Sequence, residues 1–250
     1  MLLADKTVIV TGGSRGIGAA VAIGCAQHGA NVVINHNSQA DATVAAIKAL
    51  GRGVLALKGD VADPATGAQL VQAAVEHFGG VDVLISNAGI CPFHAFLDMP
   101  VETLKRTMEV NLHGAYFVTQ AVANQMKQQG RGGAIIAMSS ISALVGGEFQ
   151  THYTPTKAGV HSLMQSCAIA LGKYGIRCNS LLPGTILTDI NKDDLSDPAK
   201  KEYFEKRIPL GRFGQPEDLV GPAVFLASDL AQYVTGAALL VDGGMFVNLQ

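Results

Sequence analysis

The segment Thr11-Gly12-Gly13-Ser14-Arg15-Gly16-Ile17-Gly18 decides the fold of this 250-residue chain. It follows a short apolar run and opens a stretch of helical length. Gly12 permits a tight turn, Gly16 lets the backbone approach a pyrophosphate, and Gly18 allows a helix to pack closely on a strand. The N-terminus of the following helix offers free N–H groups to phosphate oxygens. The segment predicts a dinucleotide-binding turn, although glycine clusters also occur in generic strand–helix turns.

Apolar runs of strand length alternate with stretches of helical length along the whole chain. Several runs are apolar at consecutive positions and rich in Val and Ile, as in strands buried on both faces of a parallel sheet. The expected strands are Thr7–Val10, Asn31–Ile34, Val54–Leu57, Asp82–Ile85, Ala134–Met138, Ile176–Leu182 and Ala238–Val241. Stretches such as Ile17–His28 and Ala65–His77 separate them. The alternation predicts an α/β fold, a doubly wound Rossmann-type parallel sheet with helices on both faces, forming one domain over residues 1–250.

The composition argues for a small-molecule ligand. The chain is 48% hydrophobic and 15% charged, with a formal net charge of −2, so neither nucleic acid nor a membrane is expected as a partner. No apolar run reaches the ~18–20 residues of a membrane span, and Met1–Lys6 lacks the apolar core of a secretory signal. The four cysteines form no CxxC pair and have no nearby His at metal-ligand spacing. We therefore expect a cytoplasmic protein with reduced thiols and no metal site.

The segment Leu187–Arg212 breaks the alternation of strands and helices. It holds many charges and two prolines, and it has little apolar periodicity. It follows the sixth expected strand, at the sheet edge where ligands normally bind. Because long loops in compact domains are often functional, we expect a substrate lid over residues 187–212, with a solvated surface excursion as the alternative.

The strongest catalytic signal is Tyr153-Thr154-Pro155-Thr156-Lys157. Tyr and Lys at i and i+4 fall on one face of a helix, and Pro155 would lie in its first turn. A free tyrosine has a pKa near ~10, and a nearby ammonium such as that of Lys157 favours the phenolate. Ser140 follows the fifth strand and can donate to a substrate oxygen as charge develops there. The set predicts Tyr153 as catalytic acid/base with Lys157 and Ser140 as partners, whereas a YxxxK spacing alone is usually an exposed helix pair.

Two further strand ends carry candidate cofactor contacts. Asp60-Val61 follows the third expected strand, where the carboxylate can accept from an adenine amino group or cap the next helix. Asn87-Ala88-Gly89 follows the fourth strand, and its small residues let a nicotinamide ribose lie against the backbone.

The end of the second expected strand bears on the choice of cofactor. A carboxylate there would bind the ribose 2′-OH and favour NAD. This chain instead has Asn35 followed by His36, Asn37 and Ser38, and Arg15 is placed to meet a 2′-phosphate. NADP is therefore favoured, while NAD remains usable because neutral side chains can still donate to a 2′-OH.

Together these motifs resemble the short-chain dehydrogenase/reductase family over the whole chain. The residues that carry the resemblance are Thr11–Gly18, Asp60, Asn87-Ala88-Gly89, Asn111, Ser140, Tyr153, Lys157, Pro183-Gly184 and Val241-Asp242-Gly243-Gly244. One departure is Ser86, where the family often has Asn. The resemblance implies a seven-stranded parallel sheet, cofactor contacts from Pro183, Gly184, Ile186 and Thr188, and usually a homotetramer. It also implies that Asn111 helps to pass a proton through water to Lys157.

The segments expected to face the substrate resemble family members that oxidise a sugar at its anomeric carbon. They are Asn87–Asp98, Ser139–Glu148, Gln150–Tyr153 and Val247–Gln250. The resemblance implies hydride transfer from C1 of an aldose, with L-rhamnose as the expected sugar, to give a lactone. Side chains suited to bonding sugar hydroxyls are Ser142, Gln150, Thr151 and His94. Phe93 could pack on the apolar face of the sugar, while His94 and His152 could equally be surface or packing residues.

Two other functions remain open from the sequence alone. A 3-oxoacyl-thioester reductase, or another carbonyl reductase of the same family, would need a basic patch for its carrier protein, and the sequence locates none. A non-catalytic dinucleotide-binding protein could lose Tyr153 or Lys157, yet both are present. The expected helices Val101–Gln129 and Pro155–Gly172 carry small and apolar residues that suit either subunit packing or cover of the sheet.

Overall fold

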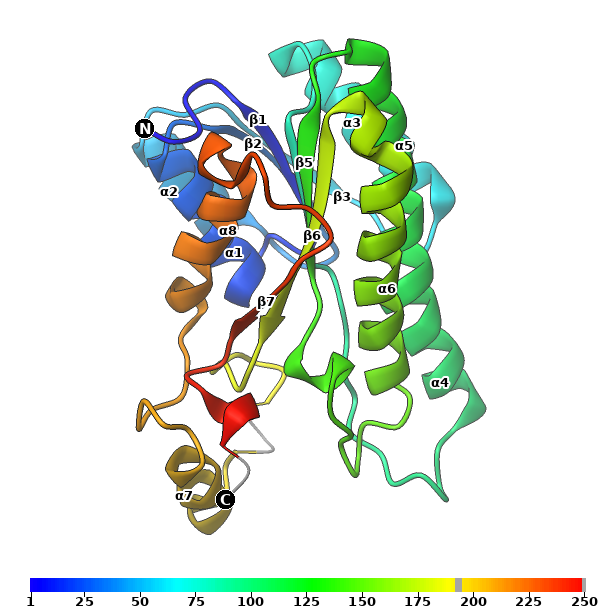
Figure 1. Cartoon of the computed structure of the whole chain (residues 1–250), viewed down its shortest axis with the longest axis vertical. Helices are drawn as coiled ribbons and strands as arrows, with labels where there is room; N and C mark the ends of the chain where they lie inside the picture. Colours follow the sequence, from blue (N-terminus) through cyan, green and yellow to red (C-terminus); the bar gives the residue numbers. More distant parts are fainter. Residues whose placement is uncertain (192–194, 249–250) are drawn as a thin grey trace.

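Seven parallel strands form one sheet in the order β3-β2-β1-β4-β5-β6-β7 (Figure 1). The computed structural model describes residues 1–191 and 195–248. The strands are β1 Thr7–Val10, β2 Asn31–His36, β3 Val54–Lys58, β4 Val83–Ser86, β5 Gly133–Met138, β6 Ile176–Pro183 and β7 Ala238–Val241. Every expected strand is present, and the predicted doubly wound α/β fold is confirmed. The largest differences are at β2, which continues to His36, and at β4, which lies one residue later than expected.

Helices cover both faces of the sheet, and each layer has its own apolar core. The helices are α1 Gly16–Gln27, α2 Asp41–Ala49, α3 Pro64–Phe78, α4 Val101–Met108, α5 Gly114–Gln129, α6 Thr154–Leu171, α7 Pro198–Lys206 and α8 Val220–Ala227. Figure 1 shows α1, α2 and α8 on one side of the sheet and α5 and α6 on the other. Within β1, Val8 and Val10 belong to the first core and Ile9 to the second, as the two-residue period of a strand requires. No helix within residues 1–191 and 195–248 has the length and apolarity needed to cross a membrane.

The start of α3 corrects one expectation about Asp60. The residue that caps α3 is Asp63, whose carboxylate accepts from the backbone N–H of Ala65 at 2.9 Å, with Pro64 in the first turn. Helix capping by Asp60 is therefore wrong, and its side chain is left for other contacts.

The helix expected over Val101–Gln129 is present with these bounds, but it is not a regular α-helix throughout. A π-helical turn at Glu109–His113 lies between α4 and α5. Asn111 within this turn bonds the backbone of Ile90 twice, accepting from its N–H at 2.8 Å and donating to its carbonyl at 2.9 Å. The hydrogen bonds of a π turn join residues five positions apart instead of four, so the turn contains one extra residue. Such turns often occur at functional sites. The turn holds the buried Asn111 side chain against the loop that follows β4.

The site is positioned where the sheet reverses its order. β1 and β4 are neighbours in the sheet although they are far apart in the chain, and ligands of open α/β sheets bind at the carboxyl ends of such strands. Thr11 joins the two strand ends, because its hydroxyl accepts from the backbone N–H groups of Asn87 at 2.9 Å and Ala88 at 3.0 Å. The phosphate-binding turn and the Asn87-Ala88-Gly89 segment therefore lie together.

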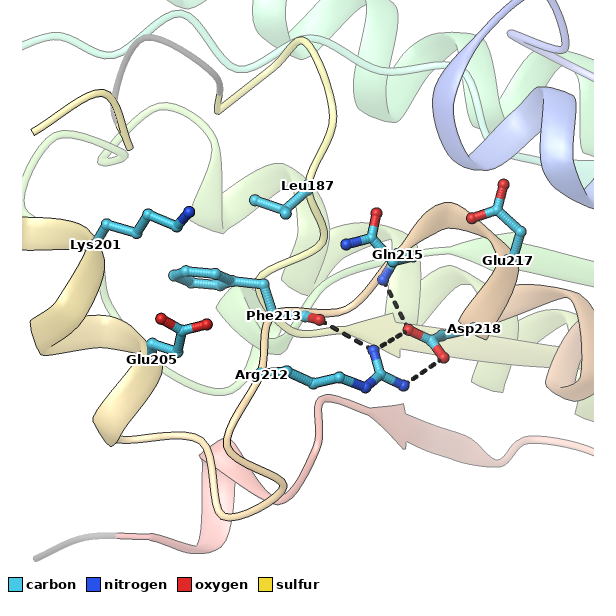
Figure 2. A pocket seen from close by; sticks show the side chains of 8 residues that line it. All are labelled: Leu187, Lys201, Glu205, Arg212, Phe213, Gln215, Glu217 and Asp218. Carbon is cyan, nitrogen blue, oxygen red and sulfur yellow. Dashed lines mark hydrogen bonds and ion pairs between the residues drawn. The ribbon is translucent and has the colours of Figure 1, made fainter. Parts of the chain in front are cut away.

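The segment 187–212 contains α7 and packs on its own small apolar cluster; its residues 192–194 lie outside the described part. The buried members of that cluster are Leu195, Ile208 and Phe213. A small cavity of about 430 Å³ lies between α7 and the loop that follows it (Figure 2). We call it the second cavity, because a larger one opens at the carboxyl ends of the strands. Beside the second cavity, Arg212 and Asp218 form a two-pronged ion pair with N–O distances of 2.7 and 2.8 Å.

Candidate active site

A cavity of about 1020 Å³ opens at the carboxyl ends of the strands, at the upper end of the roughly 300–1,000 Å³ range of small-ligand sites. Nearly all of the predicted site residues line it. The predicted cofactor contacts among them are Gly12, Ser14, Arg15, Gly16, Ile17, Gly18, Asn37, Ser38, Asp60, Val61, Asn87, Ala88, Gly89, Tyr153, Lys157, Pro183, Gly184, Ile186 and Thr188. The predicted substrate contacts among them are Phe93, Ser140, Ser142, Gln150 and Tyr153. His36 is not among the lining residues, and its ring nitrogen Nδ1 bonds the carbonyl of Ser38.

The turn after β1 fits the pyrophosphate of a dinucleotide. Gly12 and Gly16 have φ angles of +64° and +54°, a region that side-chain-bearing residues rarely occupy. A Cβ added at Gly18 would lie 2.2 Å from the carbonyl oxygen of Gly12, so only glycine allows the helix to start this close to the turn. The small residues thus leave backbone exposed at the N-terminus of α1, as a bound phosphate requires.

Tyr153 lies at the N-cap of α6, one residue before the helix begins. Its carbonyl accepts from the backbone N–H of Lys157 at 3.1 Å, so the two side chains leave the same face, as predicted. Burial raises the pKa of the Tyr153 phenol, and the neighbouring thiol of Cys91 raises it further. A hydrogen bond with the Ser140 hydroxyl acts in the opposite direction and lowers this pKa.

Lys157 is buried next to Tyr153. Its Nζ atom donates to the carbonyl of Met138 at 2.9 Å and lies 5.4 Å from the centre of the Tyr153 ring. Burial lowers the pKa of the Lys157 ammonium to about 8. The sequence leads us to expect that the Lys157 ammonium lowers the pKa of the Tyr153 phenol. In the chain itself, burial has the largest effect on the pKa of each of the two side chains, and it raises that of the phenol.

Ser140 is placed by a short helical turn at Ile141–Ala143. Its hydroxyl oxygen accepts from the backbone N–H of Ser142 at 3.0 Å. An oxygen that accepts in this way keeps its own hydrogen for donation, so Ser140 can donate toward Tyr153 or toward a substrate oxygen.

Asn111 lies beside the cavity rather than in its lining. Besides its two bonds to Ile90, it donates to the hydroxyl of Thr156 at 3.2 Å. A Cβ added at Gly89 would lie 3.3 Å from the Asn111 Oδ1 atom and 3.4 Å from the Lys157 Nζ atom. The amide oxygen and the ammonium therefore face the same small space next to Gly89.

Polar side chains form one wall of the cavity next to Tyr153. The Ser142 hydroxyl donates to the Gln150 Oε1 atom at 3.4 Å, and the Gln150 amide donates to the thiol sulfur of Cys91 at 3.5 Å. His94 and Thr151 do not line the cavity. His152 is buried at 1% exposure and also does not line it; burial lowers the pKa of its imidazole. His152 therefore fits the packing alternative.

Two ion pairs at the cavity were not expected from the sequence. Arg106 binds the Asp60 carboxylate at 2.6 Å, and Arg15 binds the Asp189 carboxylate at 3.0 Å. Both pairs join residues that are distant in the chain, so no local pattern identifies them. Cys91 and Asn191 also line the cavity; the sequence placed them in the expected substrate-facing segment and lid without giving either a role of its own. Within the described ranges, no group of three or more His, Cys, Asp or Glu side chains is arranged to hold a metal ion.

Comparisons with known proteins agree with this geometry. Residues 12–246 match the sequence family described as enoyl-(acyl carrier protein) reductase. The chain is 71% identical to the L-rhamnose 1-dehydrogenase (NAD(P)(+)) of Sphingomonas sp. (strain SKA58), covering 100% of this chain and 99% of that protein. It is 66% identical to the enzyme of the same name from Azotobacter vinelandii, covering 100% of both. The crystal structure of a short-chain type dehydrogenase/reductase from Mycobacterium marinum superposes with a TM-score of 0.93 at 34% identity, covering 97% of this chain and 96% of that one.

Proposed function

This chain belongs to the short-chain dehydrogenase/reductase family, and we propose that it oxidises L-rhamnose at C1 to the lactone, passing the hydride to NADP or NAD. It is an NAD(P)-dependent oxidoreductase, as are the relatives of 66–71% identity named for this reaction. The observation that carries the proposal is the position of the Tyr153 phenol. It lies between the Ser140 hydroxyl, the Lys157 ammonium and a wall of sugar-compatible polar groups.

The chemistry follows from these side chains. The anomeric hydroxyl of the sugar would accept a hydrogen bond from Ser140 and give its proton to the Tyr153 phenolate. When bound, the oxidised nicotinamide accepts the hydride and brings a positive charge to the site. Positive charge close to a phenol favours the phenolate, which offsets the effect of burial on its pKa. Lys157 is placed to hold the nicotinamide ribose and to add to that charge.

Asn111 supports this proton transfer in the proposal. The space next to Gly89 that its amide oxygen shares with the Lys157 ammonium could hold a water molecule. Such a water would pass the proton onward from Lys157 toward solvent.

Sugar recognition is proposed for three lining residues. Ser142 and Gln150 would bond hydroxyl groups, since they lie on the same wall and already bond one another. Phe93 would take the apolar face or the methyl group of the sugar.

The cofactor contacts favour NADP without excluding NAD. The end of β2 carries neutral Asn37 and Ser38 at the cavity, and the Ser14 and Ser38 hydroxyls lie 3.0 Å apart. Arg15 supplies a cation at the same turn. Neutral donors can serve a 2′-OH, while a cation serves a 2′-phosphate, so both cofactors have partners here.

The segment 187–212 is proposed to act as a lid within a single domain of residues 1–250. Its residues Thr188, Asp189, Asn191 and Phe204 line the cavity. Closure of such a segment would exclude water from the reacting atoms.

A homotetramer in the cytoplasm completes the proposal. The outer faces of α4, α5 and α6 expose large apolar side chains, among them Val101, Tyr116 and Ile169. Apolar exposure on neighbouring helices suits packing between subunits. Cys25 and Cys178 are buried thiols of the apolar core, as is usual in a reducing compartment.

The direct test is a screen of free aldoses against NADP and NAD, following absorbance of the reduced cofactor at alkaline pH. L-rhamnose should give the highest kcat/KM, and the purified product should be the lactone. Reduction of an acetoacetyl thioester is the matched reaction for the competing function. Ready thioester reduction without any L-rhamnose-dependent cofactor reduction would overturn the proposal.

A further inference from the structure

The guanidinium of Arg15 is already bound to a carboxylate. Its NH1 atom lies 3.0 Å from the Oδ2 atom of Asp189, and both side chains are about two-thirds exposed, at 67% and 64%. Arg15 belongs to the phosphate-binding turn, and Asp189 lies in the segment 187–212, so the ion pair crosses from one wall of the cavity to another. The cation that suits a 2′-phosphate therefore has a competing anionic partner.

We propose that Asp189 sets the balance between NADP and NAD by competing with the 2′-phosphate for Arg15. With NAD the ion pair persists and ties the phosphate-binding turn to the segment 187–212. With NADP the guanidinium turns to the 2′-phosphate, and the pair is lost. The inference rests on the proposed function only in that the site binds a nicotinamide dinucleotide; it does not depend on which sugar is oxidised.

The charges around the cavity leave Arg15 as the cation open to this competition. The cations that line it in the described part of the chain are Arg15, Arg106 and Lys157. Arg106 is held by Asp60 at 2.6 Å, and Lys157 is buried beside Tyr153. The β2-end residues that line the cavity, Asn35, Asn37 and Ser38, are neutral amides and a hydroxyl, and His36 does not line it. A 2′-phosphate bound there would depend on Arg15 for its counter-charge.

The relative strengths of the two pairings decide what each cofactor does. An exposed carboxylate–guanidinium pair contributes little, because water and salt screen it. A phosphate carries more charge and accepts two parallel bonds from a guanidinium, so it displaces the carboxylate. Breaking the Arg15–Asp189 pair and leaving the Asp189 carboxylate near the phosphate both weaken NADP binding. NAD avoids both costs.

The turn that carries Asp189 has a second set of contacts besides this ion pair. The Asn191 side chain accepts from the backbone N–H of Thr188 at 3.0 Å and donates to the carbonyl of Ile186 at 2.9 Å. These bonds close the turn that carries Asp189. The variant Asp189→Asn, which keeps the size of the side chain, should therefore fold normally and change only the competition.

The test measures the Kd of NADP and of NAD by isothermal titration calorimetry without sugar, so it reads binding rather than turnover. Asp189→Asn should tighten NADP binding by roughly two- to fivefold, the range expected for loss of an exposed competing ion pair, and leave NAD binding unchanged or slightly weaker. Arg15→Ala should weaken NADP far more than NAD. In the double variant, the gain from Asp189→Asn should disappear. Glu205→Gln is the control, since it removes the same charge from α7 at the second cavity (Figure 2).

Equal changes for both cofactors in Asp189→Asn would overturn the inference, as would a gain that persists in the Arg15→Ala background or one that Glu205→Gln reproduces. Amide hydrogen exchange of residues 187–191 gives a second readout. NADP should leave these amides less protected than NAD does in the native chain, and equally protected in Asp189→Asn. Failure of L-rhamnose oxidation with these binding changes intact would refute the sugar assignment alone.

Discussion

The Lys157 ammonium lies 5.4 Å from the centre of the Tyr153 ring while its hydrogen bond goes to the main chain at Met138. The two side chains are thus held in place by separate contacts. Both residues belong to the start of α6, but the Tyr153 hydroxyl bonds Ser140 whereas the Lys157 Nζ atom bonds β5. Because the polar ends have different partners, we expect their roles to be separable by substitution.

Tyr153→Phe should lower kcat by roughly 10²–10⁴-fold, the usual contribution of a positioned acid or base. The ring keeps its packing, and only the oxygen that exchanges the proton is lost. Calorimetric Kd values for NADP and NAD should match the native chain. Turnover close to the native rate would show that another group moves the proton.

The rate of sugar oxidation should rise with pH from neutral into the alkaline range. Burial raises the pKa of Tyr153, so the phenolate that accepts the proton increases as the pH rises. Lys157 carries its positive charge only below its lowered pKa of about 8, so Lys157→Met should lose most rate in the neutral part of the profile and steepen the rise toward alkaline pH. The measurement is kcat against pH for both proteins at saturating sugar and cofactor. A profile that is flat in the native chain, or unchanged in shape in the variant, would contradict the assignment.

Gln150→Leu should lower kcat/KM for L-rhamnose by about tenfold, as expected when one hydrogen bond to the substrate is lost. A site built around hydroxyls discriminates because an unmatched polar group is left without a partner. Poorer sugars that do not satisfy this amide should lose less. Gln69→Leu, an exposed change on α3 away from the proposed subunit interface, is the matched control. A uniform loss across all sugars would argue for a structural role.

Asp218→Asn should destabilise the chain by about 1 kcal/mol at neutral pH, a modest value because the pair is partly exposed. The hydrogen bond from Arg212 lowers the pKa of Asp218 to about 2 (Figure 2). A carboxylate with a lowered folded pKa stabilises above its unfolded pKa of ~3.9 and loses that effect as the pH falls through about 2. Urea unfolding of native and variant chains should therefore converge across this acid window. Glu217→Gln serves as the comparison, and a pH-independent difference would contradict the account.

Sedimentation at micromolar concentration should give a single tetrameric species. Ile169 on α6 is 86% exposed in the isolated chain and would be covered by a neighbouring subunit. Ile169→Glu should then yield smaller species with an unchanged circular dichroism spectrum. A native monomer would refute the tetramer, and an intact tetramer in the variant would place the interface elsewhere.

The strands were predictable because most of them are short runs of consecutive apolar residues. β1 and β7 have the predicted bounds. For β1 the run lies between the polar Lys6 and Thr11, and all four of its residues are buried. The glycine turn and the Tyr153–Lys157 pair were predictable for a similar reason, as each is a local spacing with a local geometric meaning.

What the sequence could not reveal depends on contacts between distant residues. The π-helical turn depends on Asn111 bonding Ile90, 21 positions away. The Asp60–Arg106 and Arg15–Asp189 pairs join residues 46 and 174 positions apart. The strong influence of burial on the Tyr153 and Lys157 pKa values likewise arises only once the fold surrounds both groups.

The π-helical turn at Glu109–His113 also constrains how this helix can be redesigned. One residue advances an α-helix by about 100°. The extra residue of the turn therefore sets the angular phase of α5 relative to α4. Deleting one residue here would let the two helices merge into a regular α-helix with better local hydrogen bonding. We expect the same deletion to turn the Asn111 side chain away from Ile90 and to break its two bonds to that backbone. A regular α-helix at this position is therefore incompatible with the observed position of Asn111 beside the cavity.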